Sequence, residues 1–469
     1  MPKQISLFNT ATRTVEVFKP ITPGEVGIYC CGPTVYNYAH IGNLRTYVFE
    51  DVLRRTFDAI GYKVNHVMNI TDVGHLQSDA DDGDDKMLLA SKREQKSPWD
   101  IAEFYTKEFF RHSEALGVVK PHIVCKATDH IQEMIDMVEQ LVAKGFAYEA
   151  NGNVYFEVSK FDDYTKFANL QLDAQQATER VEKDENKRDQ ADFCLWFSQS
   201  KYPNQIMKWD SPWGVGFPGW HIECSAMSRK YLGDRFDIHC GGIDHIPVHH
   251  TNEIAQSDCC HGHQTVNLWM HGAFLTVDSG KMSKSAGGFL TVDRLTEENF
   301  APLAYRYLIL TAHYRSELKF SFDALESAQN AYQGLLEKIQ EWRSGDVIDI
   351  NEDSETLREY KQKFWQAMCE DLHTPSALTV VWSVVKDKHL NNSEKLHLVT
   401  DFDRALGLEL AKVDRGDLSE HEQTLMEQRK LARDNKQWAE SDRLRDELLA
   451  LGITLKDSKN GMEWTRVKK

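Results

Sequence analysis

The hydrophobic positions near the start of the chain predict a strand, a loop and a helix. Residues Gly24–Cys30 are rich in β-branched and aromatic side chains, which is typical of a short buried strand that Gly32-Pro33 would end. Hydrophobic residues then recur at helical spacing from Leu44 to Phe57. A second strand is predicted over Lys63–Ile70, so the chain begins as a βαβ unit of a parallel sheet.

This first unit has the layout of a ligand site. A helix that begins directly after a strand and a loop presents free backbone N–H groups, which bind phosphate well. The loop carries the thiol of Cys31 and the imidazole of His40. Thr71-Asp72 follow the second strand, and open α/β sheets bind ligands at the carboxyl ends of their strands. The segment could therefore hold both a metal ligand and a nucleotide contact.

Downstream, the pattern divides the chain into further regions. An amphipathic helix opens at Ser97-Pro98, and residues 121–204 look like an insertion that contains a helix over His130–Lys144. Residues from Glu317 to about Leu408 are amphipathic and helical throughout, which predicts a bundle. After a polar linker, Glu420–Leu449 forms either a charged helical pair or one long helix, and two short strands follow.

Composition narrows the class of protein. A length of 469 residues suggests about three domains, and 41% hydrophobic with 27% charged residues is ordinary for a folded soluble chain. The net charge of −17 counts against a non-specific nucleic-acid binder. The N-terminus has no signal pattern and no apolar run approaches a membrane span, so we expect a cytoplasmic protein. The nine cysteines lack a disulfide-framework spacing and are expected to be free thiols or metal ligands.

A tetrahedral zinc site is one hypothesis for four of the polar residues. Two thiolates, an imidazole and a carboxylate suit zinc, and they are available from Cys31, Cys224, His249 and Glu253. His249 and Glu253 are spaced i,i+4 and would share one helix face. Buried cysteines are also common as small hydrophobic residues, and neighbouring side chains compete as ligands: His221, His245, His250, Cys259 and Cys260. A metalloprotease is disfavoured because the order His-Glu-x-x-His is absent.

Phosphate chemistry is indicated by a different pair of residues. The chain lacks the Gly-x-x-x-x-Gly-Lys-Ser/Thr loop, which argues against a P-loop kinase or ATPase. Lys281 and Lys284 instead lie in a loop flanked by glycine and serine. Lysine is a compact point charge that can follow the charge moving onto a leaving pyrophosphate.

Together these motifs resemble those of the cysteinyl-tRNA synthetases, a family of class I aminoacyl-tRNA synthetases, over essentially the whole chain. The resemblance rests on several separate segments in the same order: Tyr29–Tyr36, Asn69–Asp72, Pro218–Met227, His249–Gln256 and Lys-Met-Ser-Lys-Ser at 281–285. The stretch from Gln437 to Asp446 is also similar to the tRNA-binding end of the family.

The resemblance implies a cysteine–tRNA ligase. Such an enzyme uses ATP, with Mg²⁺, to convert L-cysteine to cysteinyl-adenylate and then transfers cysteine to tRNA(Cys). It implies one Zn²⁺ per chain, bound by Cys31, Cys224, His249 and Glu253 but not by Cys30. The zinc would take the thiolate of the substrate, a bond that the near-isosteric serine cannot match.

The resemblance also assigns roles in substrate binding. The implied catalytic residues are His40, Asn43, Lys281 and Lys284. Contacts to ATP are implied for His40, Gly42, Asn43, Asp244 and Lys284, and contacts to cysteine for Gly32, Thr71 and Trp220.

The expected fold is α/β. A Rossmann-type parallel-sheet catalytic domain with an insertion would precede an α-helical bundle and a small mixed α/β C-terminal domain. The predicted ranges are 1–120 and 205–265 for the two catalytic halves, 121–204 for the connective insertion, 266–316 for the Lys-Met-Ser-Lys-Ser loop and stem-contact region, 317–410 for an anticodon-binding bundle, and 411–469 for a linker and C-terminal tRNA-binding domain. The family suggests a monomer, with no DNA or membrane partner.

Some positions depart from the family pattern, and they bear on two rival hypotheses. The usual His-Ile-Gly-His signature ends here in Asn43, which cannot carry charge. Cys240 stands where glycine is common, and Pro247-Val248 replaces Phe-Pro. One rival is a ligase of the mycothiol-pathway type that joins cysteine to a small amine, but residues 317–469 argue against it. The other is a non-catalytic zinc-stabilised RNA-binding protein, which the presence of His40, Lys281 and Lys284 disfavours.

Overall fold

The structure is a computed structural model of the 469-residue chain. It describes residues 4–74, 86–170, 184–199, 205–277, 290–344, 348–351, 354–412, 418–458 and 461–466. Lys281 and Lys284, the predicted pyrophosphate contacts, lie outside the described residues.

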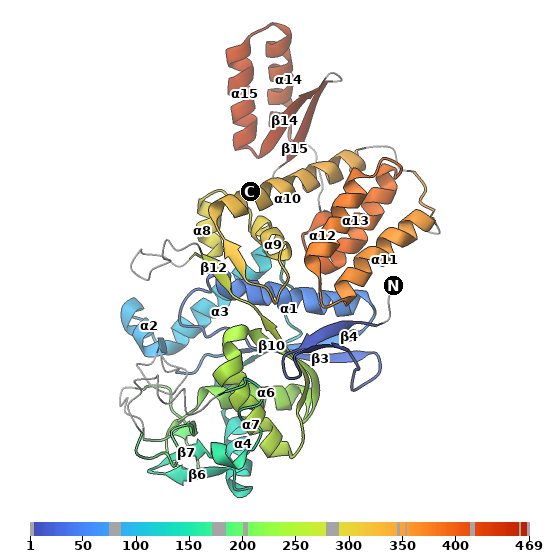
Figure 1. The fold of residues 1–469 in the computed structure, drawn as a ribbon. Coiled ribbons are helices and arrows are strands. Elements are labelled where there is room, and N and C mark those ends of the chain that lie inside the picture. Colours follow the sequence, from blue (N-terminus) through green and yellow to red (C-terminus); the bar gives the residue numbers. More distant parts are fainter. Residues whose placement is uncertain are drawn as a thin grey trace.

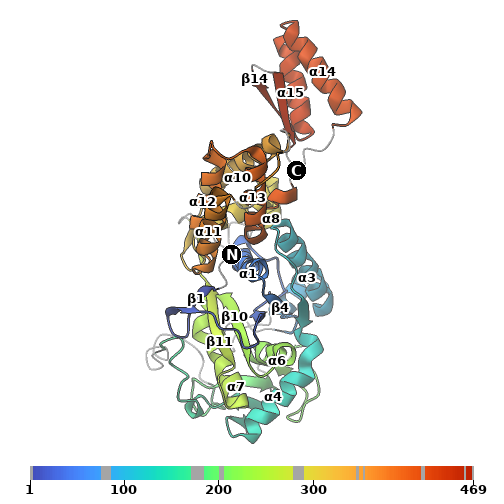
Figure 2. The same ribbon diagram turned by 90° about the vertical axis from the view of Figure 1, so that its right-hand side faces the viewer.

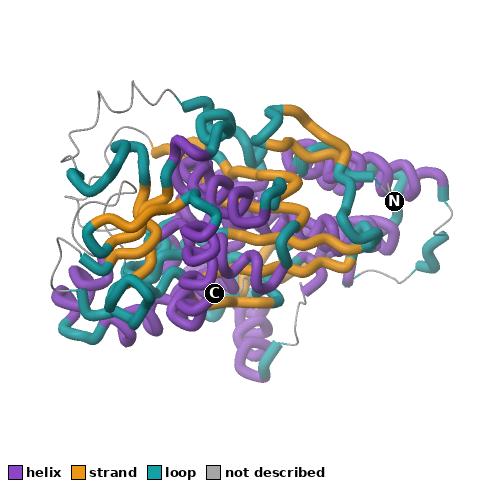
Figure 3. The backbone as a smooth tube through the Cα atoms, turned by 90° about the horizontal axis from the view of Figure 1, so that it is seen from below, coloured by secondary structure: helices purple, strands orange, loops and turns teal. Residues whose placement is uncertain are grey.

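A five-stranded parallel sheet forms the centre of the catalytic half of the molecule (Figure 1). Its order is β11-β10-β3-β4-β5, and every neighbouring pair is parallel. The bounds are Glu25–Cys30 for β3, Lys63–Ile70 for β4, Ile123–Lys126 for β5, Phe236–Gly242 for β10 and Val266–Gly272 for β11. Seen from below, the strands run side by side among helices (Figure 3). This confirms the predicted Rossmann-type core.

The helix after the first strand begins where the polar loop ends. Helix α1 spans Ile41–Ala59 and buries its apolar residues against the sheet, while Gly61 follows its end with φ +95°. Helix α3 opens as the sequence predicts, because Ser97 and Asp100 cap each other reciprocally and Pro98 occupies the first turn. Helix α3 spans Pro98–Ala115, and this half also contains α2 (Lys86–Glu94), α4 (Ile131–Ala143), α6 (Trp220–Leu232) and α7 (Thr251–His261).

Smaller sheets flank the core. The hairpin β1-β2 precedes it (Ser6–Asn9 and Thr14–Val17). A four-stranded antiparallel sheet joins three strands of the predicted insertion, β6 (Ala147–Ala150), β7 (Asn153–Phe156) and β8 (Phe193–Phe197), to β9 (Phe217–Pro218), which lies beyond its predicted end at residue 204. Strand β12 (Leu275–Val277) pairs in parallel with β13 (Leu318–Phe320). The sequence predicts only helices from Glu317 onward, but the structure has the strand β13 at the start of this segment. A strand of three residues is too short to show a strand pattern in the sequence.

Beyond the sheet lies the bundle of helices (Figures 1 and 2). It contains α10 (Phe322–Arg343), α11 (Glu355–Cys369), α12 (Thr374–Lys386) and α13 (Asn392–Leu406), and it joins the sheet side through α8 (Val292–Glu297) and α9 (Pro302–Leu310). Arg306 of α9 links the two parts: it bonds Asp51 of α1 at 2.6 Å and the carbonyl of Leu406 at 2.7 Å.

A small C-terminal unit stands at the far end of the molecule from the insertion (Figures 1 and 2). Its helices are α14 (Glu420–Asp434) and α15 (Trp438–Ala450), followed by the antiparallel strands β14 (Ile453–Ser458) and β15 (Gly461–Arg466). The helical pair forms rather than one long helix, because Lys436 takes a left-handed φ of +57° between them. None of the described helices is long and apolar enough to cross a membrane.

Candidate active site and metal centre

One cavity of about 310 Å³ opens at the carboxyl ends of the central strands. This is the edge at which open α/β sheets bind ligands. Nine of the residues predicted from the sequence line it: Cys31, Gly32, His40, Asn43, Thr71, Trp220, Cys224, Asp244 and His249. They come from four separate stretches of the chain, so the fold has brought the predicted metal and nucleotide residues to a single site.

Gly32 lies where β3 and β4 run closest together. Its backbone N–H donates to Asn69 Oδ1 at 2.8 Å, and a Cβ atom at position 32 would lie 1.6 Å from the carbonyl oxygen of Asn69. Asn69 also donates to Thr71 Oγ1 at 3.2 Å, and the Thr71 hydroxyl donates to the buried carboxyl of Glu223 at 3.0 Å. A chain of buried hydrogen bonds therefore fixes this wall of the cavity, and it requires glycine at position 32.

We expect Gly32→Ala to abolish amino-acid activation, because the new methyl group would force apart the two strand ends that frame the cavity. The measurement is pyrophosphate exchange on purified protein, with circular dichroism as the test of folding. Gly334→Ala is the matched control, since a Cβ at that helical position meets nothing within 4 Å. A Gly32→Ala protein with unchanged exchange would contradict the close packing at this strand end.

Four donor atoms converge at the base of the cavity. These atoms lie within 4.8 Å of one another, and all four residues are buried. They are Sγ of Cys31, Sγ of Cys224, a ring nitrogen of His249 and a carboxylate oxygen of Glu253. The two sulfur atoms are 3.9 Å apart. His249 and Glu253 meet at 2.9 Å between Nε2 and Oε1, across one turn of the helical segment.

This donor set fits zinc. Tetrahedral Zn²⁺ with sulfur bonds of about 2.3 Å places two thiolate ligands roughly 3.8 Å apart, close to the separation of the two cysteines. The set is mixed thiolate, imidazole and carboxylate, as zinc prefers. His249 is delivered by a π-helical turn, Ile246–His250, which precedes α7. Such turns are rare and often occur at functional sites.

Charges within the donor set are already paired. Burial opposes ionisation of Cys224, but hydrogen bonds from Cys31 and His249 lower the pKa of its thiol to about 6. Burial would lower the pKa of His249, but the carboxylate of Glu253 raises it to about 10. Glu253 itself has a strongly lowered pKa, because His239 and His249 outweigh its burial. Thiolate and carboxylate are the ligand forms that a metal needs.

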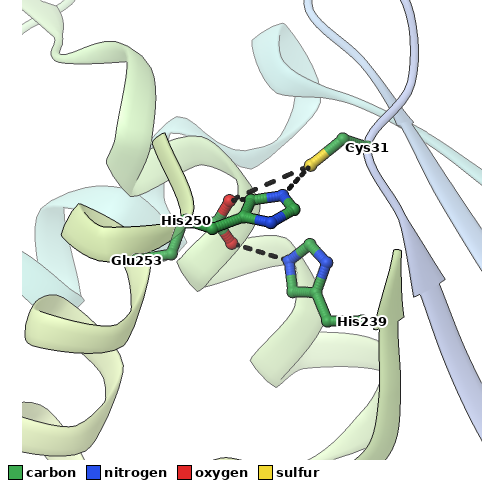
Figure 4. A group of neighbouring side chains, drawn as sticks. All are labelled: Cys31, His239, His250 and Glu253. Atoms are coloured by element: carbon green, nitrogen blue, oxygen red, sulfur yellow. Dashed lines mark hydrogen bonds and ion pairs between the residues drawn. The ribbon is translucent and has the colours of Figure 1, made fainter. Parts of the chain in front are cut away.

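Further histidines surround the four donors, and two of them, His239 and His250, form a second donor group with Cys31 and Glu253. Cys31, His239, His250 and Glu253 also lie within 4.8 Å of one another (Figure 4). The contacts are 3.3 Å from Cys31 Sγ to His250 Nε2 and 2.8 Å from His239 Nε2 to Glu253 Oε2. His250 is additionally engaged by His271 at 2.7 Å through its other nitrogen.

The remaining competitors fall outside both groups. His221 instead contacts Nδ1 of His249 at 3.0 Å, which leaves Nε2 of His249 facing Glu253. Cys30, next to Cys31 in sequence, packs in the opposite core cluster. Among the described residues, His245, Cys259 and Cys260 thus belong to neither group of side chains that could hold a metal at this site.

His40 and Asn43 form the N-terminus of α1 as a reciprocal cap. The Asn43 N–H donates to His40 Nδ1 at 3.2 Å, and the His40 N–H donates to Asn43 Oδ1 at 3.3 Å. Burial lowers the pKa of His40, although Asp244 opposes the shift. Gly42 gives the imidazole room, because a Cβ there would lie 3.0 Å from the ring. Asn43, the residue that departs from the family's His-Ile-Gly-His signature, therefore helps to hold His40 in place.

We expect Asn43→Ala to destabilise the protein by about 1 kcal/mol, the usual net contribution of one hydrogen bond, and to slow amino-acid activation because the backbone N–H of His40 loses its acceptor. Denaturant unfolding and pyrophosphate exchange measure the two effects. Glu394→Ala is the matched control: Glu394 caps α13 in the same reciprocal way with Asn391, in the helical bundle. Equal loss of activity in both variants would show that Asn43 acts through stability alone.

Sequence reasoning missed several polar residues of the site. Asn69 and Glu223 support the cavity wall, His239 contacts the predicted ligand Glu253, and His271 contacts His250 of the second donor group. His239 and His271 lie on β10 and β11 within apolar runs, and a lone histidine in such a strand carries no signal of its own. Asn69, near the end of β4, and Glu223, in the first turn of α6, lie inside the segments that carry the family resemblance, and this was the available clue.

Comparison with known proteins identifies the family. A model described as the class I (C) tRNA synthetase catalytic domain matches residues 17–330, more than half of the chain. A second model, the cysteinyl-tRNA ligase anticodon binding domain, matches residues 415–464. That range falls in the predicted C-terminal tRNA-binding region, and the assignment of anticodon binding to 317–410 stays a prediction.

Individual relatives agree with the family models. The chain is 44% identical to a cysteine–tRNA ligase of Treponema denticola, covering 99% of this chain and 100% of that protein. It is 49% identical to cysteine–tRNA ligase 1 of Burkholderia lata, covering 97% and 96%.

Solved structures show the same fold at low identity. A LeuRS in complex with tRNA and LeuAMS from Agrobacterium radiobacter aligns with TM-score 0.59 and 11% identity over 85% of each chain. The Mycobacterium tuberculosis methionyl-tRNA synthetase bound by methionyl-adenylate aligns with TM-score 0.55 and 14% identity, covering 83% of this chain and 91% of that one. With the family models, the full-length relatives and the converging site residues in agreement, this chain belongs to the cysteine–tRNA ligase family of class I aminoacyl-tRNA synthetases.

Proposed function

We propose that the protein activates L-cysteine with ATP, transfers it to tRNA(Cys), and selects cysteine through one zinc ion held by Cys31, Cys224, His249 and Glu253. The observation that carries the proposal is that three residues of this donor set, Cys31, Cys224 and His249, line the same cavity as the N-terminus of α1, with Glu253 directly behind them. The amino acid and the nucleotide can therefore lie against each other, as adenylate formation requires.

Selection through a metal ion explains how the enzyme can distinguish a side chain as small as that of cysteine. A zinc ion at this position supplies a soft Lewis acid for the substrate thiolate, and a serine hydroxyl binds it poorly. The protein's own contribution is to hold the donors rigidly. Trp220 stacks on His249 with ring centres 4.1 Å apart, and His239 fixes Glu253 from the other side. Gly32, Thr71 and Trp220 then frame the amino acid.

The nucleotide side of the cavity is built from α1. His40 and Asn43, at the N-terminus of this helix, line the cavity in which the phosphates would bind, at the end of the helix that favours negative charge. Burial lowers the pKa of His40, which favours a neutral ring that acts as a hydrogen-bond donor. Gly42, Asn43 and Asp244 complete our assignment for ATP with its Mg²⁺. Lys281 and Lys284 are proposed to follow the charge onto pyrophosphate.

Catalysis in this scheme is mostly positioning and charge stabilisation. The carboxylate of cysteine attacks the α-phosphorus of ATP and pyrophosphate leaves. The terminal ribose hydroxyl of the tRNA then attacks the carbonyl carbon of the adenylate and releases AMP. We further propose that 317–410 and 411–469 bind the body and anticodon of the tRNA, and that the enzyme acts as a monomer.

Pyrophosphate exchange with cysteine and with serine, alongside metal analysis of the same sample, tests this function. We expect exchange with cysteine only and about one zinc per chain. Exchange with both amino acids would reject selection by the metal. Exchange without charging of tRNA(Cys) would point to a small-amine acceptor, and a zinc-loaded protein with no exchange would favour a binding protein.

A further inference from the structure

A rim of aromatic and basic side chains adjoins the active-site cavity. Part of it lies on α2, which is labelled at the left of Figure 1. We define the α2–α3 rim by six residues: Tyr36, Tyr38, Lys86, Arg93, Lys96 and Phe104. Tyr36, Tyr38 and Lys86 line the cavity itself. The other three continue outward from them along α2 and the start of α3. The rim therefore belongs to the path by which a large substrate would reach the cavity.

Contacts join the six residues into two groups of three, and Tyr105 links the groups by accepting from Arg93 at 3.3 Å and by packing its ring 5.1 Å from that of Tyr38. The Lys86 Nζ lies over the ring of Tyr36 at 5.6 Å, and Arg93 donates to the carbonyl of Tyr36 at 3.3 Å. The rings of Tyr38 and Phe104 are 6.1 Å apart, edge to face. The Lys96 Nζ lies 4.7 Å above the ring of Phe104.

The charge of this segment is opposite to that of the whole protein. Residues 86–96 contain the cations Lys86, Lys92, Arg93 and Lys96 and the single anion Glu94, whereas the chain carries a net charge of −17. Lys92, Arg93 and Lys96 are exposed. Glu94 pairs with Arg93 at 2.9 Å and with Lys96 at 3.7 Å, so the cations outnumber the one carboxylate they contact and can also attract an anionic partner.

The aromatic rings make a nucleic acid the matching partner. Phe104 is 36% exposed, and it adjoins the partly exposed Tyr38. Aromatic faces beside cations are how proteins bind single-stranded nucleic acid, with bases stacked on rings and phosphates near lysine or arginine. The terminal ribose of a tRNA must enter the cavity to react, so the unpaired nucleotides just before it must cross the mouth.

We propose that the α2–α3 rim binds the single-stranded 3′ end of the tRNA, with bases stacked on Tyr38 and Phe104 and phosphates facing Lys96. This inference rests on the proposed function and adds to it the place where the acceptor end is held. It assigns Lys96 and Phe104 to tRNA binding alone, since neither lines the adenylation cavity.

The test uses the full-length variants Lys96→Glu and Phe104→Ala. For each, we expect unchanged pyrophosphate exchange and a fall of about tenfold in kcat/KM for tRNA, as for the loss of one stacked base or a phosphate contact. Lys96→Glu should also flatten the salt dependence of tRNA binding. Lys63→Glu is the matched control, an exposed lysine at the opposite end of β4.

A comparison of intact tRNA with tRNA trimmed of its unpaired 3′ end locates the effect. The wild-type protein should bind intact tRNA more tightly, and each variant should lose that preference while binding trimmed tRNA normally. Variants that keep the wild-type preference would overturn the proposal, as would an effect on the KM for ATP alone. Failure of the proposed function would show differently, as absent exchange in the unaltered protein.

Discussion

Replacing Cys224 by serine is expected to remove both the bound zinc and the cysteine-dependent exchange, with a loss of activity of at least a hundredfold. Metal affinity falls steeply because a neutral hydroxyl replaces a thiolate whose pKa is already held near 6. Metal analysis by mass spectrometry and pyrophosphate exchange on the same sample measure the two losses. They should occur together, since the amino acid is proposed to bind through the metal.

Cys30→Ser is the matched control for this experiment. Cys30 is as buried as Cys224, but it packs in the other core cluster, where its neighbours are Cys240 and Glu50. We expect this variant to keep its zinc and its activity, at some cost in stability. A Cys224→Ser protein with full zinc and normal exchange would contradict the ligand assignment.

One alternative outcome would be informative. The second donor group, Cys31 with His239, His250 and Glu253, does not use Cys224. If that group were the resident site, Cys224→Ser would keep its metal and His250→Ala would lose it. Measuring zinc in both variants therefore decides between the two sets.

The second large effect is expected on stability. Asp51→Asn should destabilise the protein by about 3–5 kcal/mol, because it leaves the buried guanidinium of Arg306 without its counter-ion. Asp51 accepts from Arg306 at 2.6 Å and from Arg55 at 2.7 Å, and the side chains of Asp51 and Arg306 are fully buried. Thermal and denaturant unfolding measure the change.

Asp58→Asn, on the same helix, is the control for Asp51→Asn. Asp58 meets Arg54 at 3.6 Å and its side chain is 48% exposed, so its loss should change stability by less than about 1 kcal/mol. Equal effects of the two substitutions would show that burial does not strengthen the Asp51 pair.

The contribution of Asp51 should also depend on pH. Burial would raise the pKa of this carboxyl, but Arg306 and Arg55 lower it below its ordinary value near 4. A lowered pKa means that the stabilisation is complete above about pH 4 and is lost as the pH falls through the folded value. The difference between wild type and Asp51→Asn should therefore be constant at neutral pH and shrink in acid.

The local pattern of apolar and capping residues in the sequence determined much of the secondary structure and the fold class of this protein. The βαβ start, the capped α3 and the α/β class follow from apolar spacing and capping residues, which act between neighbours in the chain. The i,i+4 spacing placed His249 and Glu253 on one helical face before any fold was known, and the structure has them 2.9 Å apart. The motifs also pointed to most of the residues that line the cavity.

The tertiary structure decided what depends on distant segments. Which cysteines and histidines meet is settled by strand order, because β3 and β10 are neighbours although about 200 residues separate them. Only packing shows that His221 orients His249, that Asn43 caps His40, and that Asn69 requires glycine at position 32. Burial of Asp51 with Arg306 likewise had no sequence signal, since a buried ion pair is made by two helices that meet only in the folded protein.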